Sequence, residues 1–371
     1  MGKKTRAVMS ATARARWLRL ARLRLRRLAR RRLSGAAAGL GSPPQGKTVM
    51  EWLLSPSSGL TAFISHPDCQ AHRMGQGHPE SPDRIVAIRG RLAEARLFDF
   101  LQQVPAPLAT EQQICRAHTP RYLEYLEGSA PARGTKRLDS DTALCPDSLK
   151  AIRRAAGAGV AAVDMVMSGR APNAFCCVRP PGHHAESSKA MGFCFVNNVA
   201  VAAMHALAVH RLKRVLIVDF DAHHGNGTEE IFKDDERVML ISSFQHPFFP
   251  YSGDKPIGSN PNIRNFPLPA GSDGRTFRKM VLHEWLPAIQ DFRPELFLLS
   301  AGFDAHVNDG MAFLRLNDDD FGWITARLVR QANLRCEGRL VSILEGGYDV
   351  PSLAGAVARH VEALCGRRIR E

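Results

Sequence analysis

The sequence predicts a three-layer α/β domain in which a central, mostly parallel sheet lies between two layers of helices. The first observation is a series of short apolar runs without polar alternation, at 174–178, 214–220, 237–242, 295–301 and 339–345. Such runs are typical of strands buried on both faces. The second observation is that helical patterns separate or follow these runs, at 148–167, 197–210, 274–290 and 318–335. Strands alternating with helices favour a parallel sheet with helices on both faces.

The chain has 371 residues and 44% hydrophobic content, and no repeat of about 20–50 residues is visible. We therefore expect one catalytic domain over residues 50–371.

The excess positive charge lies in the first 48 residues. They carry 14 of the 50 Lys and Arg residues and no Asp or Glu, which leaves 36 basic and 36 acidic residues in the rest of the chain. Equal numbers of acidic and basic residues in the rest of the chain do not indicate a surface that binds nucleic acid. We therefore expect residues 1–49 to be a basic, disordered extension and the domain itself not to bind nucleic acid.

Two interpretations of the extension stay open. Its Arg and Leu residues are spaced as in a basic amphipathic helix, which suits an organelle transit peptide, but the segment is poor in Ser. Alternatively, it precedes a true start near Met50. The eight cysteines contain no C-x-x-C motif and no apolar stretch is long enough to span a membrane. The expected compartment is the cytoplasm, with organelle targeting left open.

Polar clusters follow four of the five predicted strands. The runs lead into "RPPGHHAE", "DAHHGNG", "GFDAH" and "GGYD". Ligands bind beyond the carboxyl ends of the strands in open parallel sheets. The sequence therefore predicts that these four clusters converge on one site.

The cluster in "VLIVDFDAHHGNGTEE" indicates a metal site. In an extended chain Asp219, Asp221 and His223 lie on one face. Two carboxylates and one imidazole form a three-ligand set with an open fourth position, as in catalytic zinc sites. The third ligand is either Asp219 or Asp304. The other carboxylate then supports the ligands without binding the metal itself.

Two further clusters offer the groups that a metal hydrolase needs. His183 and His184 follow a Pro-Pro-Gly turn, and one imidazole could deprotonate a water molecule at the metal. Tyr348 follows two glycines that let the backbone approach closely, and its phenol could donate to a carbonyl oxygen as charge develops there.

The motifs "RPPGHHA", "GFCFVNN", "DFDAHHGNGT", "SAGFDAH" and "EGGYD" resemble those of the zinc-dependent histone deacetylase and acetylpolyamine amidohydrolase superfamily. The resemblance covers about residues 61–364 and includes "HPESPDR". Asn226 makes the chain similar to the class II branch and its bacterial relatives. The resemblance implies an arginase-like α/β fold with a parallel sheet of about eight strands.

Carried over residue by residue, the resemblance implies one zinc ion per chain on Asp221, His223 and Asp304. It also implies a structural potassium ion beside the zinc, held by the Asp219 and Ser242 side chains together with backbone carbonyls.

The same resemblance implies the catalytic roles. His184 would act as general base and then as general acid, with His183 as its electrostatic companion. Asp219 would orient His183, and Tyr348 would polarise the acetyl carbonyl.

The resemblance also implies a substrate tunnel. Phe193 and Phe249 match the aromatic pair that lines it, and Arg84 matches the arginine near the acetate exit. Met311 matches the position that helps to choose the amine, where an uncharged side chain favours lysine over a polyamine. Asp309 is an alternative charged group that the loop could swing into the tunnel mouth.

We therefore predict a zinc-dependent deacetylase acting on N-acetyl-lysine in proteins or peptides, with an acetylpolyamine or small-amide amidohydrolase as the alternative. A binuclear manganese ureohydrolase is more remote, because Gly225 and His306 stand where its second metal needs carboxylates. A silent acyl-lysine binding module is also remote, because Tyr348 and the ligands are retained. The oligomeric state stays open, and the loop with His66, Cys69, His72 and His78 is expected to be a rim without its own metal.

Overall fold

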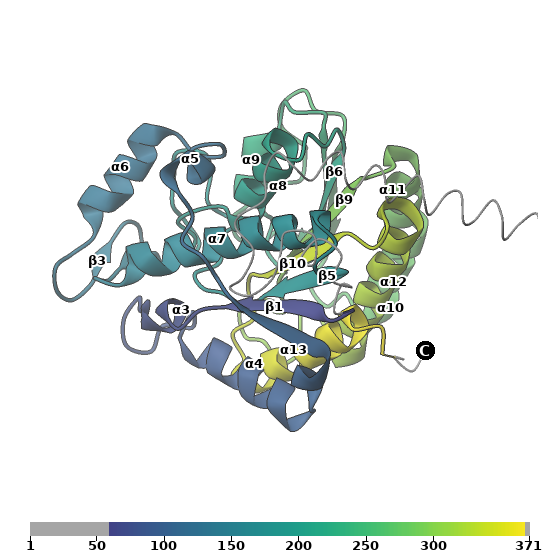
Figure 1. Ribbon diagram of the computed structural model, residues 1–371, viewed down its shortest axis with the longest axis horizontal. Coiled ribbons are helices and arrows are strands. Elements are labelled where there is room, and N and C mark those ends of the chain that lie inside the picture. Colours follow the sequence, from purple (N-terminus) through teal and green to yellow (C-terminus); the bar gives the residue numbers. More distant parts are fainter. Residues whose placement is uncertain (1–58, 368–371) are drawn as a thin grey trace, which may run out of the picture. The chain divides into compact units, whose positions relative to one another are not determined.

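The computed structural model describes residues 59–367, so the predicted extension at 1–49 lies outside the described residues. An eight-stranded sheet forms the centre (Figure 1), in the order β2-β1-β5-β10-β9-β6-β7-β8. Every neighbouring pair is parallel, which confirms the predicted fold class. The strands are β1 (Thr61–Ser65), β2 (Leu101–Pro105), β5 (Asn173–Cys176), β6 (Val215–Asp219), β7 (Val238–Gln245), β8 (Ile263–Leu268), β9 (Leu296–Ala301) and β10 (Leu340–Leu344).

Five of the eight strands coincide with the apolar runs of the sequence. The other three are β1, β2 and β8, and two of them form the edges of the sheet. The edge strand "LQQVP" buries only its first residue and "IRNFPL" buries only its two end residues, while the other residues are partly or fully exposed. Because an edge strand is covered less completely, it does not need a continuous apolar run. A separate two-stranded ribbon joins β3 (Lys136–Arg137) to β4 (Ala143–Leu144).

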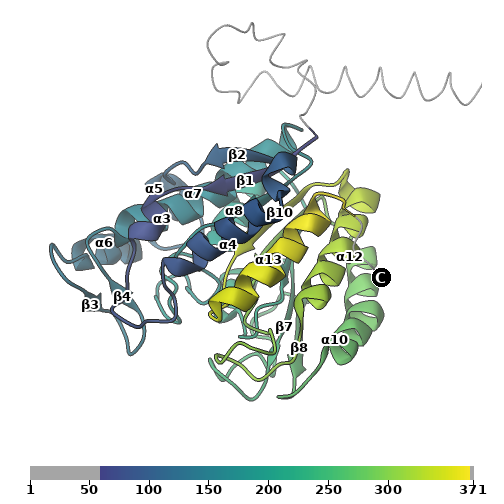
Figure 2. The same ribbon diagram turned by 90° about the horizontal axis from the view of Figure 1, so that it is seen from below.

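Helices cover both faces of the sheet. Figure 2 shows one layer side by side, formed by α4 (Asp83–Glu94), α13 (Val350–Leu364), α12 (Asp318–Cys336) and α10 (Gly274–Met280). The opposite layer contains α7 (Ser148–Met167) and α8 (Asn198–Ala208), with α9 (Asn226–Phe232) beside them. Further helices are α3 (Asp68–Ala71), η2 (Leu97–Phe100), α5 (Glu111–Ile114) and α6 (Pro120–Ser129).

The helix predicted at 274–290 is interrupted by a π turn. The segment η3 (Val281–Trp285) connects α10 to α11 (Leu286–Phe292), and Pro287 lies in the first turn of α11. Proline has no N–H and its ring crowds the carbonyl four residues earlier, which accounts for a widened turn at this place.

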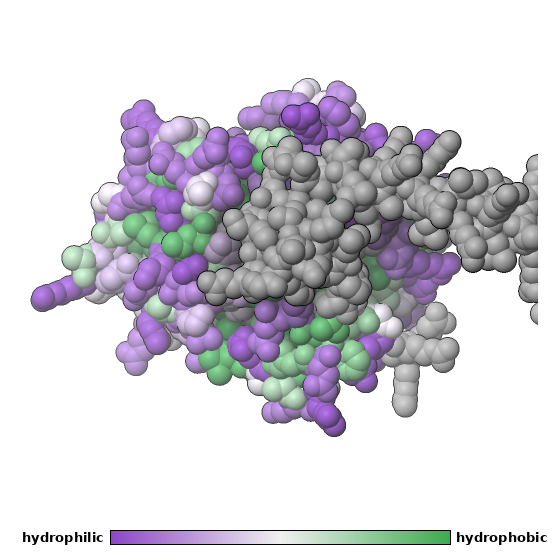
Figure 3. Space-filling view, viewed as in Figure 1, coloured by the Kyte–Doolittle hydropathy of each residue, from purple (hydrophilic) through white to green (hydrophobic). Residues whose placement is uncertain are grey.

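The surface is mixed in polarity. On the face seen in Figure 3, hydrophilic side chains are interspersed with small apolar groups. No helix within residues 59–367 is both long and apolar enough to cross a membrane.

The topology brings the four polar clusters together. Strands β5, β10, β9 and β6 are consecutive neighbours in the sheet. Each of these strands is followed by one of the clusters found in the sequence, and parallel strands end at the same edge. The sequence-based prediction of convergence is thereby explained by strand order.

A buried ionic cluster lies close to this edge. Glu80, Arg84 and Arg179 are fully buried. The Glu80 carboxylate accepts from Nη1 of Arg84 at 3.1 Å and from Nη2 of Arg179 at 2.6 Å. Burial by itself would raise the pKa of Glu80, but the two guanidinium groups outweigh burial and lower the pKa to about 2.

We expect Glu80→Gln to lower the free energy of unfolding by about 3 kcal/mol at pH 7, because it leaves two buried guanidinium groups without a counter-charge. The pKa of Glu80 is lowered on folding, so its contribution is complete above about pH 4.5 and is lost as the pH falls towards 2. Denaturant unfolding from pH 7 down to pH 3 measures this effect. Glu94→Gln, which removes an exposed partner of Arg91, should cost at most about 0.5 kcal/mol. Equal losses in the two variants would contradict the prediction.

Candidate active site

The structure brings Asp221, His223 and Asp304 together at the carboxyl ends of β6 and β9. One ligand atom of each lies within 4.8 Å of the others. Nδ1 of His223 is 3.1 Å from Oδ1 of Asp221 and 3.1 Å from Oδ2 of Asp304. All three residues are buried. Of the two candidate third ligands in the sequence, Asp304 is therefore the one that joins this group.

Backbone amides hold the two carboxylates in place. Asp221 accepts from the N–H of His223 and of Gly346, both at 2.9 Å, and Asp304 accepts from Ala222 at 2.8 Å. A Cβ atom at Gly346 would lie 2.2 Å from Oδ2 of Asp304 and 2.6 Å from Oδ2 of Asp221. Only glycine allows the backbone to approach both carboxylates this closely.

The His223 ring is oriented from its far side. Its Nε2 lies 3.1 Å from the carbonyl oxygen of Met311, which can only accept. A metal ligand must be the neutral imidazole, and this contact would then keep its proton on Nε2 and leave the Nδ1 lone pair free for a metal ion. Metal-ligating histidines are commonly fixed in this way by a carbonyl oxygen.

The donor set fits a divalent cation. Burial and the negative charge of Asp221 raise the pKa of Asp304 to about 6. Two carboxylates buried this closely repel each other, and a divalent ion between them and the imidazole would offset that repulsion. Two oxygen ligands and one nitrogen ligand, with room for a fourth, match catalytic zinc.

His183 and His184 lie side by side with ring centroids 4.0 Å apart, but their environments differ. Nδ1 of His183 lies 3.0 Å from Oδ2 of Asp219. Burial alone would lower the pKa of His183, but the Asp221 and Asp219 carboxylates outweigh burial and raise it to about 10. The contact with Asp219 therefore favours the charged form of His183.

His184 is neutral. Burial and the neighbouring imidazoles of His183 and His223 hold its pKa well below the usual value. Its Nδ1 lies 2.8 Å from Oδ1 of Asn226, while the amide nitrogen of Asn226 donates to Glu186 at 3.0 Å. The proton of His184 therefore sits on Nδ1, and its Nε2 is free to accept a proton.

Tyr348 follows β10 and is half-buried. Its ring meets Phe193 edge-on, with centroids 5.7 Å apart, and the Arg84 guanidinium lies 5.0 Å from the ring centre. Burial and the carboxylates of Asp304 and Asp221 hold its pKa well above the usual value. The phenol is therefore protonated and able to donate.

The two phenylalanines that were predicted to line the tunnel contact different residues of the site. Phe193 contacts Tyr348. Phe249 is half-buried and meets His184 edge-on at 5.2 Å and His223 at 6.1 Å between centroids. Phe248, which the sequence analysis did not single out, stacks on His223 at 5.6 Å.

The predicted acetate-exit residue Arg84 is buried against the tyrosine loop. Its Nε donates to the carbonyl of Gly347 at 2.6 Å and its Nη2 donates to the carbonyl of Glu345. Arg84 thus holds the backbone that carries Tyr348, a role that the sequence analysis did not assign.

Two acidic residues of the site have roles that the sequence analysis missed. Glu345 is fully buried and accepts from the N–H of Gly182 at 2.6 Å and of His183 at 3.2 Å. Burial raises its pKa to about 7, although His183 opposes this.

The Asp309 carboxylate is also buried and accepts only backbone N–H groups, so it does not project into a tunnel mouth. The available signal was that Glu345 is the first residue of "EGGYD" and that Asp309 lies three residues after "SAGFDAH".

Several polar residues of the motifs lie outside this arrangement. His224 turns away and binds Glu229 at 2.6 Å and Ser252 at 2.9 Å. In the loop at 66–78, His72 binds Ser148 at 2.7 Å. Within residues 59–367 this loop forms no group of metal-ligand atoms.

A second group of potential ligand atoms joins α7 to the end of α8. Oδ1 of Asp164 lies 2.8 Å from Nε2 of His205 and 2.7 Å from Nε2 of His210. Arg116, which can only donate, lies 3.1 Å from Nδ1 of His205. The proton of His205 is therefore on Nε2 and points at Asp164, so the group is a hydrogen-bonded link between helices.

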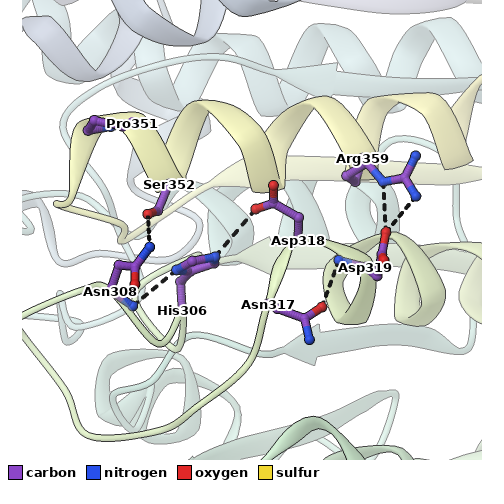
Figure 4. A pocket seen from close by; sticks show the side chains of 8 residues that line it. All are labelled: His306, Asn308, Asn317, Asp318, Asp319, Pro351, Ser352 and Arg359. Atoms are coloured by element: carbon purple, nitrogen blue, oxygen red, sulfur yellow. Dashed lines mark hydrogen bonds and ion pairs between the residues drawn. The ribbon is translucent and has the colours of Figure 1, made fainter.

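A polar cleft of about 570 Å³ lies behind the loop that carries Asp304. Figure 4 shows His306 in this cleft, where its Nε2 is 3.4 Å from Oδ1 of Asp318. Asn308 of the same loop donates to Ser352 at 3.1 Å. His306 is therefore directed away from the ligand set.

Comparisons with known proteins agree with this architecture. A family model described as a histone deacetylase domain matches residues 78–364. A Pseudomonas aeruginosa protein named histone deacetylase-like amidohydrolase is 38% identical over 301 residues, which are 79% of this chain and 78% of that protein. A Homo sapiens protein named polyamine deacetylase HDAC10 is 34% identical over 326 residues, which are 82% of this chain and 48% of that protein.

The fold is also similar to a solved structure. The HDA15 HD domain matches with a TM-score of 0.78 at 33% sequence identity, covering 83% of this chain and 89% of that one. The family model, the relatives and this likeness confirm the resemblance found in the sequence motifs. The chain therefore belongs to the histone deacetylase family of hydrolases.

Proposed function

We propose that this protein is a zinc-dependent deacetylase that hydrolyses the amide of N-acetyl-lysine to the free amine and acetate. The observation that carries the proposal is the buried group of Asp221, His223 and Asp304, with the His184 ring 6.0 Å from the His223 ring between centroids. Metal ligands, a base and an oxyanion donor are the parts that amide hydrolysis needs.

The chain's own residues then have separate tasks. Bound zinc supplies Lewis acidity, which polarises a carbonyl and acidifies water. His184 accepts the proton of the attacking water at Nε2, since its Nδ1 is engaged with Asn226. His183 stays charged beside Asp219 and stabilises the negative charge that develops. The Tyr348 hydroxyl donates to the amide oxygen, and His184 returns its proton to the leaving amine as the C–N bond breaks.

The rival functions fit less well. A second metal would need carboxylates at the positions of Gly225 and His306, and His306 is directed into the cleft towards Asp318. Within residues 59–367, the ligand set beside β6 and β9 offers atoms for one ion. A silent binding module would have no use for a base and a phenol beside the ligands.

An assay panel with metal analysis tests the proposal. We expect about one zinc ion per chain and hydrolysis of acetyl-lysine peptides, measured beside acetylated polyamines, longer acyl-lysines and small amides. Purified protein with one zinc ion that hydrolyses none of these amides would refute the function, and activity confined to acetylpolyamines would support the alternative.

We include a structural potassium ion in the proposal. Ser242 pairs with Asp219 across β6 and β7, and its Oγ is buried without a hydrogen-bond partner among the described residues. An unpartnered buried hydroxyl beside a carboxylate suits a cation. Comparing activity in potassium and tetramethylammonium buffers tests this part, which equal activity would refute.

The preference for lysine over polyamines rests on the loop after Asp304. Met311 is half-buried and uncharged, and the nearby Asp309 carboxylate is occupied by backbone N–H groups. A second substrate ammonium would therefore find no counter-charge from these two residues, and burying it unpaired is costly.

We expect Met311→Glu to raise kcat/KM for acetylspermidine relative to an acetyl-lysine peptide by about tenfold, because one charge-assisted contact is worth about 1.5 kcal/mol. Competition kinetics with both substrates measures the ratio. Met311→Gln is the matched control, since it adds polarity without charge. A wild-type enzyme that already prefers the polyamine, or an equal shift in both variants, would contradict this prediction.

The proposed compartment is the cytoplasm. All eight cysteines are free thiols, which suits a reducing environment. Subcellular fractionation of the full chain tests this, and recovery in an organelle would favour the transit-peptide interpretation of residues 1–49.

A further inference from the structure

We propose that Asp309 is a positioning residue that sets the Tyr348 hydroxyl relative to the metal ligands. The residue is only 5% exposed. Oδ1 accepts from the N–H of Met311 at 2.9 Å, and Oδ2 accepts from Tyr348 at 2.6 Å and Asp349 at 3.0 Å. One side chain thus joins the loop after β9 to the loop after β10. This inference rests on the deacetylase function proposed above.

On one side, Asp309 acts on the ligand set. It fixes the backbone at Met311, whose carbonyl oxygen accepts from Nε2 of His223 at 3.1 Å. The direction in which Nδ1 of His223 points therefore depends on the same short loop segment that Asp309 folds.

On the other side, Asp309 acts on the tyrosine loop. Gly346 must lack a side chain because of the ligand carboxylates, and Gly347 has φ +118°. These glycines allow the close approach but also leave the loop with few steric restraints. Arg84 holds the loop by its carbonyl groups, and Asp309 holds it by the N–H groups of Tyr348 and Asp349.

The Tyr348 side chain has little else to fix it. Within residues 59–367 its hydroxyl makes no hydrogen bond, and its ring is held by Phe193 and Arg84. The backbone anchor therefore determines where the hydroxyl lies. Because a misplacement of about 1 Å can cost about 100-fold in rate, a second anchor on this loop matters for turnover.

The test compares Asp309→Asn in two backgrounds. An amide offers one acceptor oxygen and turns its NH₂ group towards N–H donors. We expect one zinc ion per chain, a KM within about threefold of wild type, and a kcat lowered by about 10- to 100-fold. In a Tyr348→Phe background, the same substitution should cause a smaller loss of kcat, because the hydroxyl that Asp309 positions is absent and only its effect on His223 through Met311 remains.

The matched control is Asn308→Ala. Asn308 joins the same loop to Ser352 by an exposed hydrogen bond that does not involve Tyr348, so its kcat should stay within about twofold of wild type. In wild-type protein, the amides of Tyr348 and Asp349 should exchange slowly with deuterium.

The outcomes separate the two proposals. A wild-type enzyme inactive on every amide refutes the function, whatever the exchange rates. If wild type is active, the positioning role is overturned by unchanged kcat in Asp309→Asn, by an equal loss in both backgrounds, or by fast exchange of the two amides. If Asp309→Asn does not fold, Asp309→Glu replaces it in the same comparison. Failure of both to fold would show that Asp309 serves folding and would also overturn the proposal.

Discussion

Asp304→Ala is expected to abolish both zinc binding and deacetylation. The substitution removes one of three ligands and leaves Asp221 and His223, which cannot fill a tetrahedral site. It also deprives the N–H of Ala222 of its acceptor. Loss of a residue that only hydrogen-bonds to a ligand already costs about 10- to 100-fold in metal affinity. Loss of a ligand itself should therefore lower the metal affinity by more than about 100-fold.

Metal analysis after dialysis and turnover of an acetyl-lysine peptide measure this result. Asp164→Ala is the matched control, because Asp164 also lies between histidines but outside the site; it should keep one zinc ion and full turnover. Asp304→Asn preserves the side-chain shape and separates loss of charge from loss of volume. An Asp304→Ala protein with full zinc and full turnover would show that the ligand set is wrong.

Tyr348→Phe is expected to lower kcat by about 10²- to 10³-fold while the zinc content and KM stay close to wild type. Only the developing oxyanion needs the hydroxyl, and one such donor contributes about that factor in rate. The ring contacts with Phe193 and Arg84 do not involve the hydroxyl, so the aromatic wall is retained.

Steady-state kinetics with an acetyl-lysine peptide separates kcat from KM. Tyr125→Phe, which removes a hydroxyl from a residue that is 54% exposed, should leave both constants unchanged. A raised KM with unchanged kcat in Tyr348→Phe would instead mark Tyr348 as a binding residue.

Much of the fold could be predicted because the central strands are buried on both faces. The runs at β5, β6, β7, β9 and β10 contain few polar residues, and each is short enough to be a strand. The edge strands β2 and β8 could not be found in this way, since "LQQVP" and "IRNFPL" carry exposed polar residues. Their pairing partners, β1 and β7, are set by the tertiary fold.

The residues grouped at the site could also be named from the sequence, since their motifs come after the predicted strands. Their supporting contacts could not. Asp309 holds Tyr348 across 39 positions of sequence, and Glu345 holds Gly182 across 163. Such contacts join side chains to backbone N–H groups, which every residue type except proline has, so no residue pattern marks the partner.

Strand order has a consequence for biosynthesis. The last strand to leave the ribosome, β10, lies between β5 and β9, near the middle of the sheet. A nascent chain that has emerged only as far as α12 therefore has two partial sheets, each with an open edge that another chain could pair with. The strand that joins the two halves also carries Tyr348 just beyond its end. During translation, the two partial sheets therefore lose their open inner edges at the same stage at which Tyr348 completes the set of candidate catalytic groups.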